Sequence, residues 1–488
     1  MSRPFDAKRY KRLLEGLDVT ALTLRDVRRG NDKLRIDSGY FAKLAVETQK
    51  RVESMLHVEL GVLCATFRKG IFDIKADSYV DSGVPFVRIS NLRDGLIDNA
   101  DLVYITEATH QKEHATALRS GDVVLSKTAY PAASFVNLPV CNVSQDTIAV
   151  RLSPSGKRRC NSGYLATYLN CRFGLSLMRR QFQGNVQEHL SLPDGRKIPI
   201  PLLGDSLQTR IDRCVREADI GLQKANEHLL QADVILAASI GLSAWQPPRP
   251  LSYTRRASQI FAAGRLDAEH YQEQYFALAR QLQGYVGGCV SLGELCPNPV
   301  NGVEIREYQD EGVPYLRVGD LRNFTVSPDQ VKRVAPDAAA REMSKVRLQS
   351  GDVLVSRSGS LAVTGVVEPG WQHALISSHL IRVRIADEAF DPYYVAVFLA
   401  VLPGRMQIEQ QSNGGVQPEI NQPALKRVLI PRLDGRVQAD IRAAVANAHA
   451  ARDRAHQLLA AAQRAVEIAI EQDEAAALSY LDGFDTAP

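Results

Sequence analysis

The sequence predicts an α+β fold made by tandem duplication, in which an α/β domain followed by a long helix occurs twice. Residues 83–93 return in closely similar form as residues 312–322. Residues 118–127 return as residues 348–357. A run of apolar residues with a heptad period follows each copy. Matches that keep one order and one offset, here about 230 residues, indicate an internal repeat.

The composition is that of a globular protein without a strong charge bias. Of 488 residues, 45% are apolar and 23% are charged, and 59 basic residues against 55 acidic ones leave a net charge of +4. This balance neither implies nor excludes a polyanionic partner, because local patches steer nucleic acid. Seven cysteines without a Cys-x-x-Cys pair disfavour a disulfide framework or a zinc ribbon, so no metal site is expected.

The ends and the apolar stretches of the chain bear on its location. The N-terminus lacks the apolar core of a signal peptide, and no stretch approaches the roughly 20 apolar residues that cross a bilayer. We therefore expect a cytoplasmic protein with no membrane partner.

The repeat and the changes in composition divide the chain into seven predicted segments. They are residues 1–56, an N-terminal helical segment; 57–204, the first domain; 205–241, the first long helix; 242–284, a linker with a short helix; 285–434, the second domain; 435–476, the second long helix; and 477–488, a flexible tail.

Each predicted domain mixes short strands with a helix. In residues 57–204, short β-rich runs alternate with turns that contain glycine and proline. Apolar residues at helical spacing predict one helix across residues 164–180, and its counterpart lies at residues 392–406. The pattern is typical of an α/β domain, and it occurs twice.

The long helices are predicted from an apolar seam in each copy. Steps of four and three residues alternate along the seams, which is the heptad period of a coiled coil. A single apolar seam is unstable in water, so the two helices are expected to pair as an antiparallel coiled-coil spacer with pseudo-two-fold symmetry. The second seam has the charged Arg452 where the first has Leu222. The apolar seam residues are Ile211, Val215, Ala218, Leu222, Ala225, Leu229, Ala232 and Leu236, then Ile441, Val445, Ala448, Ala455, Leu459, Ala462 and Val466.

The sequence lacks the motifs of several common enzyme classes. It has no phosphate-binding loop, no dinucleotide-binding glycine motif, no nucleophile elbow and no zinc-binding His-Glu-x-x-His helix. It also lacks the Asn/Asp-Pro-Pro-Tyr/Phe tetrapeptide of amino-methyltransferases. We therefore expect a binding module without catalytic residues, although an enzyme with an unrecognised site stays an alternative.

A third set of repeated motifs completes an ordered array. The second copy contributes residues 312–321, 351–360, 374–377, 414–417 and 430–431, and then Gln438 at the start of the long helix. The first copy matches at Gly184, Val186, Gln187 and Pro201. Its residues 127–131 stand where the second copy has an Arg-Ser-Gly-Ser loop. With this array the chain resembles the specificity subunit of type I restriction–modification enzymes over nearly its whole length.

The resemblance implies a DNA-binding subunit that does no chemistry itself and reads a bipartite site through two target-recognition domains. It implies as partners double-stranded DNA, two DNA methyltransferase subunits that bring S-adenosylmethionine and, in some complexes, a motor–nuclease restriction subunit. No cofactor is expected in this chain. Such a subunit serves DNA methylation in a restriction–modification or related phage-defence system. From the residues alone, a non-catalytic protein–protein scaffold with two equivalent docking domains stays an alternative.

Polar residues in and near the repeated loops are the predicted DNA contacts. Lysine and arginine position a protein on phosphates, whereas arginine, asparagine and glutamine read base edges in the major groove. Arg88 and Arg317 could instead form structural salt bridges, and Asp122 and Asp352 are expected to cap turns. The candidates are Arg88, Asn91, Arg93, Lys127 and Asn137 in the first domain, and Arg317, Asp320, Arg322, Arg357, Ser358 and Asn413 in the second.

Overall fold

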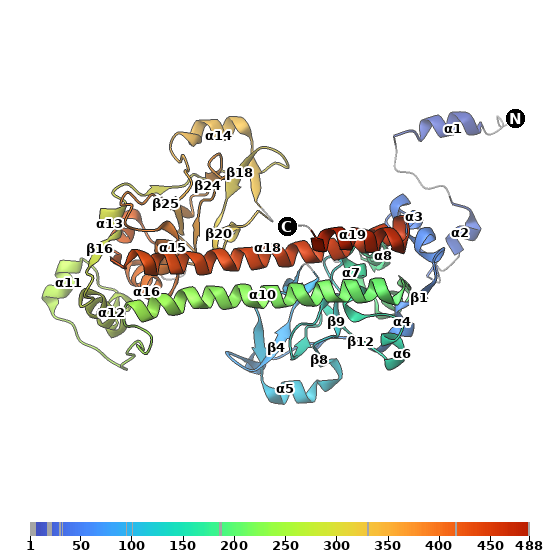
Figure 1. The fold of residues 1–488 in the computed structure, drawn as a ribbon, viewed down its shortest axis with the longest axis horizontal. Helices are drawn as coiled ribbons and strands as arrows, with labels where there is room; N and C mark the ends of the chain where they lie inside the picture. The colour runs from blue at the N-terminus through green and yellow to red at the C-terminus, as the bar shows by residue number, and fades with distance from the viewer. Residues whose placement is uncertain are drawn as a thin grey trace. The chain divides into compact units, whose positions relative to one another are not determined.

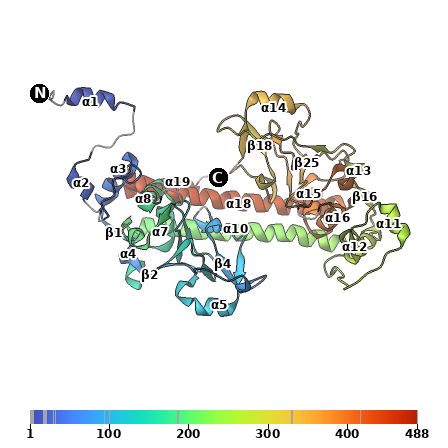
Figure 2. The same ribbon diagram turned by 180° about the vertical axis from the view of Figure 1, so that it is seen from behind.

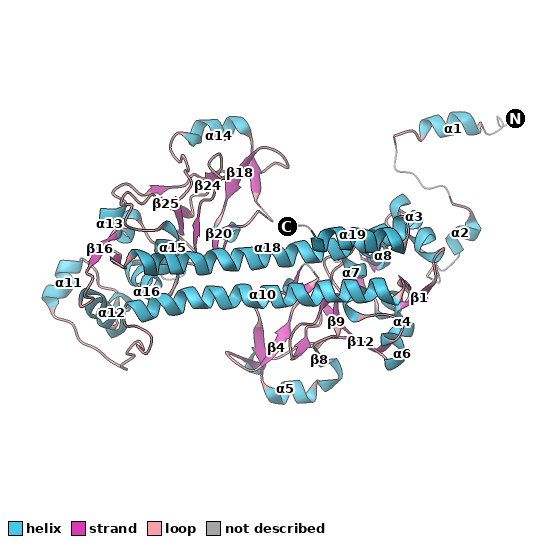
Figure 3. Ribbon diagram, viewed as in Figure 1, coloured by secondary structure: helices cyan, strands magenta, loops and turns pink. Residues whose placement is uncertain are grey.

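The chain forms two compact units, one within residues 1–222 and 452–488 (unit 1) and the other within residues 223–451 (unit 2). Helices and strands alternate in both units (Figure 3), which confirms the α+β class. The computed structural model describes residues 6–16, 22–28, 31, 33–93, 95–99, 101–184, 188–328, 331–414 and 417–486.

Two long helices each contribute to both units (Figure 1). They are α10, Asp205–Ser239, and α18, Gly435–Glu471. A last helix, α19, Glu474–Thr486, returns to unit 1.

Unit 1 begins with three short helices, of which α3 lies beside α8 of the domain that follows (Figures 1 and 2). Its elements are α1 Ala7–Leu13, α2 Leu24–Arg28, α3 Lys43–Glu53, β1 His57–Glu59, α4 Leu60–Leu63, β2 Cys64–Lys69, η1 Ala76–Ser78, β3 Tyr79–Val80, β4 Val84–Val87, η2 Ile89–Asn91, β5 Leu92–Arg93, β6 Leu96–Ile97, β7 Val103–Ile105, α5 Glu107–Lys112, η3 His114–Thr116, β8 Leu118–Arg119, β9 Val123–Ser126, β10 Ala133–Phe135, β11 Val140–Val143, β12 Thr147–Leu152, α6 Pro154–Lys157, α7 Ser162–Asn170, α8 Arg172–Gln181, β13 Phe182–Gln183, β14 His189–Leu190, α9 Leu192–Arg196 and β15 Pro199–Pro201.

Unit 2 repeats this order between the two long helices. Its elements are α11 Ala257–Ala263, η4 Ala268–Tyr271, α12 Glu273–Gln283, β16 Cys289–Ser291, α13 Leu292–Leu295, β17 Val300–Asn301, β18 Val313–Leu316, η5 Val318–Asp320, β19 Leu321–Arg322, β20 Phe324–Val326, β21 Lys332–Val334, α14 Pro336–Met343, β22 Val353–Ser356, β23 Thr364–Val366, β24 Leu375–Ile376, β25 Leu380–Val383, α15 Pro392–Ala400, α16 Leu402–Gln411, α17 Gln422–Leu425 and β26 Leu429–Pro431.

The sheets carry the duplication strand by strand. Unit 1 has a six-stranded sheet with the order β2-β12-β9-β10-β6-β5, and unit 2 has one with the order β17-β25-β22-β23-β20-β19. In each sheet the third and second strands pair antiparallel, whereas the fourth and fifth pair parallel. The tandem duplication predicted from short matches therefore extends to topology.

The helix predicted across residues 164–180 is in fact two helices, and so is its counterpart. The backbone is extended at Cys171, between α7 and α8, and at Val401, between α15 and α16. The second helix of each pair turns back closely over the first. A Cβ atom on Gly174 would lie 2.0 Å from the Tyr168 carbonyl oxygen, so only glycine fits at this crossing.

The prediction of a flexible tail at residues 477–488 is wrong for the part that the structure describes. Those residues belong to α19, whose Ala477 and Leu481 are buried in the core of unit 1. The Glu474 carboxylate accepts the Gly204 N–H at 2.9 and 3.0 Å, and these two residues are far apart in the sequence. The bounds of the other six segments stay predictions.

Each unit buries apolar residues of both long helices in one core. In unit 1, Ile211 and Val215 of α10 share a core with Leu459 and Ala462 of α18. In unit 2 the core contains Ala232 and Leu236 of α10 together with Ile441 and Val445 of α18. The start of one helix thus shares a core with the end of the other. Continuous pairing as a coiled coil stays a prediction.

The seven cysteines are free thiols, as expected for a chain without a disulfide framework. Within the described ranges, no helix is long and apolar enough to cross a membrane.

A buried aspartate ties the N-terminal segment to the first domain and predicts a pH effect. Asp194 accepts hydrogen bonds from Lys33 at 2.6 Å, Ser191 at 2.5 Å and Gln183 at 2.8 Å. Burial raises the pKa of Asp194, but the hydrogen bonds from Lys33 and Ser191, together with the charges of Lys33 and Lys197, outweigh it and leave the pKa below its usual value. A depressed folded-state pKa stabilises the protein above the unfolded-state pKa, and this contribution disappears as the pH falls through the folded-state value.

Asp194→Asn should therefore lower the free energy of unfolding at pH 7 and reduce its dependence on pH between about pH 5 and pH 2. Denaturant titrations at several pH values measure both effects. A variant with the same pH profile as the wild type would contradict the role given to this carboxylate.

Candidate nucleic-acid interface

The loop that follows β9 brings together side chains from three separate segments of unit 1. The Lys127 N–H donates to the Asp146 carbonyl at 2.8 Å, and the Leu190 N–H donates to the Lys127 carbonyl at 2.7 Å. Thr128 forms an antiparallel bridge with His189. Backbone hydrogen bonds therefore fix Lys127, Thr128, Asp146 and His189 next to one another, whatever their side chains are.

The loop that follows β22 has the same backbone arrangement in unit 2. The Arg357 N–H donates to the His379 carbonyl at 2.7 Å, and the Ile420 N–H donates to the Arg357 carbonyl at 2.9 Å. Ser358 forms an antiparallel bridge with Glu419. We call these four places the frame positions. They hold Lys127, Thr128, Asp146 and His189 in unit 1, and Arg357, Ser358, His379 and Glu419 in unit 2.

The frame positions fall into two chemical groups. Two of them keep their chemistry between the copies: lysine corresponds to arginine, and threonine corresponds to serine. The other two change it, because Asp146 corresponds to His379 and His189 corresponds to Glu419. Each unit therefore presents the same kind of cation next to two different polar side chains, whereas the hydroxyl residue is buried in unit 1, where Thr128 is 8% exposed.

The loop of the first copy keeps the backbone shape of the second despite its different sequence. Ala129 has a φ of +64° where Gly359 has +78°, so both lie in the left-handed region. An alanine tolerates this conformation at a cost of roughly 1–2 kcal/mol that glycine does not pay. The replacement of the Arg-Ser-Gly-Ser loop thus changes side chains and leaves the frame in place.

In the unit 1 frame, Lys127 lies close to a second lysine, Lys69. Partial burial and then the charge of nearby Lys69 lower the pKa of Lys127 below its ordinary value. Lys69 itself places its ammonium 4.3 Å from the ring centroid of Phe72, which is exposed. An anion bound here would offset the repulsion between the two lysines.

The unit 2 frame is more internally paired. Arg357 forms an ion pair with Glu419, and the Ser358 hydroxyl lies 2.5 Å from Nδ1 of His379. Next to the frame, Ser378 precedes His379 in the sequence and donates a hydrogen bond to Glu304. Glu304 in turn pairs with Arg306 at 3.1 Å.

Two predicted DNA contacts are wrong. Asn91 and Asp320 occupy equivalent turns and are only 1% and 3% exposed. Asn91 Oδ1 accepts the Arg88 N–H at 2.9 Å, and Asp320 accepts the Arg317 N–H at 2.7 Å. Both side chains cap the 3₁₀ turns η2 and η5, so neither is available to a base.

Asn137 joins the first domain to a long helix. Its amide donates to Asp219 of α10 at 2.9 Å. Unit 2 has a comparable contact, in which Oε1 of Glu368 lies 3.9 Å from Nδ1 of His449 in α18. The arrangement therefore gives Asn137 a structural role and lends no support to its predicted contact with DNA.

The predicted arginines divide into structural and exposed ones. Arg317 pairs with Asp320 at 3.4 Å, which is the structural salt bridge considered as the alternative, whereas Arg88 donates to the backbone carbonyl of Asp101 at 2.7 Å. Arg93 and Arg322 are exposed at the equivalent ends of β5 and β19. Their contact with DNA stays a prediction.

Among the other predicted residues, Lys127 lies in the unit 1 frame, and Arg357 and Ser358 lie in the unit 2 frame, next to Asn413; their contact with DNA stays a prediction. Asn413 is exposed, and its backbone exchanges two 2.8 Å hydrogen bonds with Glu419. Neighbouring residues of the third repeated motif, Val186, Gln187, Gly415 and Val416, lie outside the described residues.

The turn caps expected at the repeated aspartates are present. Asp122 accepts the Arg119 N–H at 3.0 Å, and Asp352 accepts the Gln349 N–H at 2.7 Å. Asp122 also pairs with Arg151 of β12, and Asp352 pairs with Arg384, which follows β25; the hydrogen bonds to Asp352 raise the pKa of Arg384.

Comparison with known proteins finds no matching family model and no matching curated protein. Among solved structures, the S subunit of a type I restriction–modification system from M. genitalium is similar at 12% identity and a TM-score of 0.40, over 85% of this chain and 94% of that one. The HsdS subunit from Thermoanaerobacter tengcongensis is similar at 16% identity and a TM-score of 0.28, over 86% of this chain and 96% of that one.

A third structure, which concerns complex assembly and conformational transition of the type I R-M system, is similar at 17% identity and a TM-score of 0.25. The similarity covers 87% of this chain and 96% of that one. Each of the three similarities spans at least 85% of this chain.

Four frame residues were not predicted from the sequence: Asp146, His189, His379 and Glu419. They follow or precede repeated motifs but differ between the copies, so a search for matches passes over them. An alignment of the two copies that marks mismatches beside matched loops would have found them.

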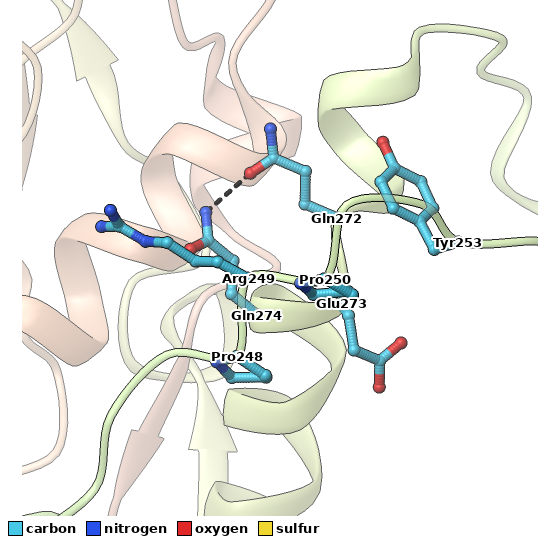
Figure 4. A pocket seen from close by; sticks show the side chains of 7 residues that line it. All are labelled: Pro248, Arg249, Pro250, Tyr253, Gln272, Glu273 and Gln274. Atoms are coloured by element: carbon cyan, nitrogen blue, oxygen red, sulfur yellow. Dashed lines mark hydrogen bonds between the residues drawn. The ribbon is translucent and has the colours of Figure 1, made fainter.

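A pocket in the linker region of unit 2 shows no catalytic arrangement (Figure 4). Glu273 on its wall is held by Arg255 at 2.8 Å and by Arg280 at 2.7 Å. Gln274 donates to Gln272 at 2.7 Å. In the part of the chain that the structure describes, no group of His, Cys, Asp and Glu residues could hold a metal ion.

Proposed function

We propose that this chain is the DNA-binding specificity subunit of a restriction–modification or related phage-defence complex. Each unit binds one half of a bipartite site on double-stranded DNA, and the chain itself carries out no catalysis. It recruits two DNA methyltransferase subunits, which supply S-adenosylmethionine, and in some complexes a motor–nuclease subunit. The pairing of α10 with α18 as an antiparallel spacer is part of the same proposal.

The observation that carries this proposal is the frame that occurs in both units. A cation kept in both units suits a phosphate, which is the same at every DNA sequence. Polar side chains that differ between the copies suit base edges, which differ between two half-sites. A scaffold with two equivalent docking domains would have no reason to keep the chemistry of two frame positions and change that of the other two.

Sequencing of the methylome with and without the gene tests the function. Deletion should remove one class of methylation marks, all at a bipartite site. Exchange of residues 57–203 for those of a relative should then change one half-site only. If deletion removes no bipartite mark, the role in DNA modification is wrong, and if both half-sites change, the two-reader arrangement is wrong.

Lys127→Ala should weaken DNA binding uniformly across sequences and reduce its dependence on salt. Loss of one phosphate contact lowers the slope of log affinity against log salt concentration by about 1. Binding of labelled duplex DNA by the complex between about 50 and 300 mM salt measures the slope. Lys112→Ala, which removes an exposed lysine of α5, is the matched control and should leave the slope unchanged. An unchanged slope for Lys127→Ala would exclude this phosphate contact, and binding without any salt dependence would favour the scaffold.

A further inference from the structure

We infer that Glu419 reads the exocyclic amine of a cytosine in the half-site bound by unit 2. The inference rests on the proposed function and adds to it the base that one side chain recognises.

The backbone of Glu419 is fixed from two sides. Its N–H and carbonyl each form a 2.8 Å hydrogen bond with the backbone of Asn413, and it also forms a bridge with Ser358. The next residue, Ile420, is fully buried and donates to the Arg357 carbonyl. The carboxylate is therefore presented from a rigid support, which is what base readout requires.

The carboxylate is the more exposed partner of its ion pair. The side chain of Glu419 is 46% exposed, against 29% for Arg357. Arg357 holds Oε1 of Glu419, while Oε2 makes no hydrogen bond within the described part of the chain. The pair thus orients one carboxylate oxygen and leaves the other available as an acceptor.

On a DNA-binding surface phosphates repel a carboxylate, so the second oxygen, Oε2, requires a donor from a base. Adenine N6 and cytosine N4 are the donors that bases present in the major groove. Adenine places the acceptor N7 beside its amine, and this acceptor would face the carboxylate. The adenine amine also has O4 of the paired thymine on its other side, whereas the cytosine amine has an acceptor, O6 of the paired guanine, on one side only, so a group that can only accept favours cytosine.

The comparison between the copies assigns this role to Glu419 rather than to Arg357. The cation is kept as Lys127 in unit 1, which suits the phosphate that both half-sites share. The position of Glu419 holds His189 in unit 1, and a histidine offers a different set of donors and acceptors. The change at this frame position therefore matches a change of base.

Glu419→Gln tests the inference, because glutamine keeps the shape and adds a donor that suits adenine. Methylome sequencing should show a change at one base pair of one half-site, from cytosine toward adenine. The preference should shift by about fivefold to a hundredfold, which is the discrimination of one good base contact. His189→Glu should alter the other half-site only. Glu342→Gln, in a partly exposed ion pair with Lys345 of the same unit, is the matched control and should change neither half-site.

Three other results would contradict the role given to Glu419. They leave the proposed function standing as long as the wild-type protein directs methylation at a bipartite site. Unchanged marks in Glu419→Gln show that this carboxylate reads no base. Loss of every mark, with the melting temperature of the purified variant unchanged, shows that it supports general affinity instead. Changes by Glu419→Gln and His189→Glu in the same half-site show that the two frames are not equivalent readers. If wild-type cells lose no bipartite mark on deletion of the gene, the proposed function itself fails.

Discussion

Gln438→Leu is expected to lower the free energy of unfolding of unit 2 by about 3 kcal/mol. Gln438 is a side chain of α18 that is only 3% exposed. Its Oε1 accepts the Asp391 N–H at 2.8 Å, and its Nε2 donates to the carbonyls of Ala389 and Leu433 at 2.9 Å each. Leucine has a similar size but leaves all three backbone groups without this partner. A buried polar group that loses its hydrogen bond costs about 1–3 kcal/mol.

The same clamp exists in unit 1, where Gln208 of α10 accepts the Asn161 N–H and donates to the carbonyls of Arg159 and Leu203. Gln208→Leu should therefore destabilise unit 1 by a similar amount. Denaturant titration of the full chain measures the loss, and hydrogen–deuterium exchange shows which unit opens. Gln457→Leu, at an exposed position of α18, is the matched control and should change stability by less than about 0.5 kcal/mol. Equal effects of Gln438→Leu and Gln457→Leu would contradict the clamp.

Gly404→Ala should destabilise unit 2 by more than about 3 kcal/mol, one of the largest effects expected for a single methyl group. A Cβ atom at Gly404 would lie 2.1 Å from the Phe398 carbonyl oxygen and 2.5 Å from Leu399 Cα. Both are backbone atoms of α15, so relief requires the two helices to separate. Separation opens a cavity in the core that surrounds Phe398, and the cost of cavities adds to that of the clash.

The melting temperature and the yield of folded protein measure this effect. Gly435→Ala is the control in the same unit, because no atom lies within 4 Å of the position that its Cβ would take. It should be neutral or slightly stabilising, since alanine favours a helix. Gly174→Ala should repeat the loss in unit 1. A Gly404→Ala protein as stable as Gly435→Ala would show that the crossing of α15 and α16 is looser than the structure has it.

The duplication and the long helices could be predicted from the sequence because their signals are local and repeated. Gln438 even appears in the repeated array, although its neighbours alone do not reveal that it binds three backbone groups. The break at Cys171 could not be predicted, because the apolar spacing continues through it. Only the contact between Gly174 and Tyr168 shows why the chain turns there.

The last helix and the site show two further limits of local signals. Five of residues 477–486 are apolar, but the order of this stretch depends on a core in which Ala477 and Leu481 meet residues such as Leu207 that lie far away in the sequence. Asn91 and Asp320 have the same residue types whether they cap a turn or read a base. Lys127 and Arg357 were predicted because they match between the copies, whereas Glu419 was missed because it does not.

Unit 1 is assembled from two stretches of chain, with the whole of unit 2 between them. During synthesis Ile211 and Val215 of α10 leave the ribosome long before Leu459 and Ala462, which share their core. At about 5–20 residues per second, the intervening stretch takes roughly 10–50 seconds to synthesise. Unit 2 is therefore the first to possess all of its residues. Throughout that interval the apolar seam of α10 in unit 1 lacks its core partners from α18 and α19, and transiently exposed apolar surface favours aggregation.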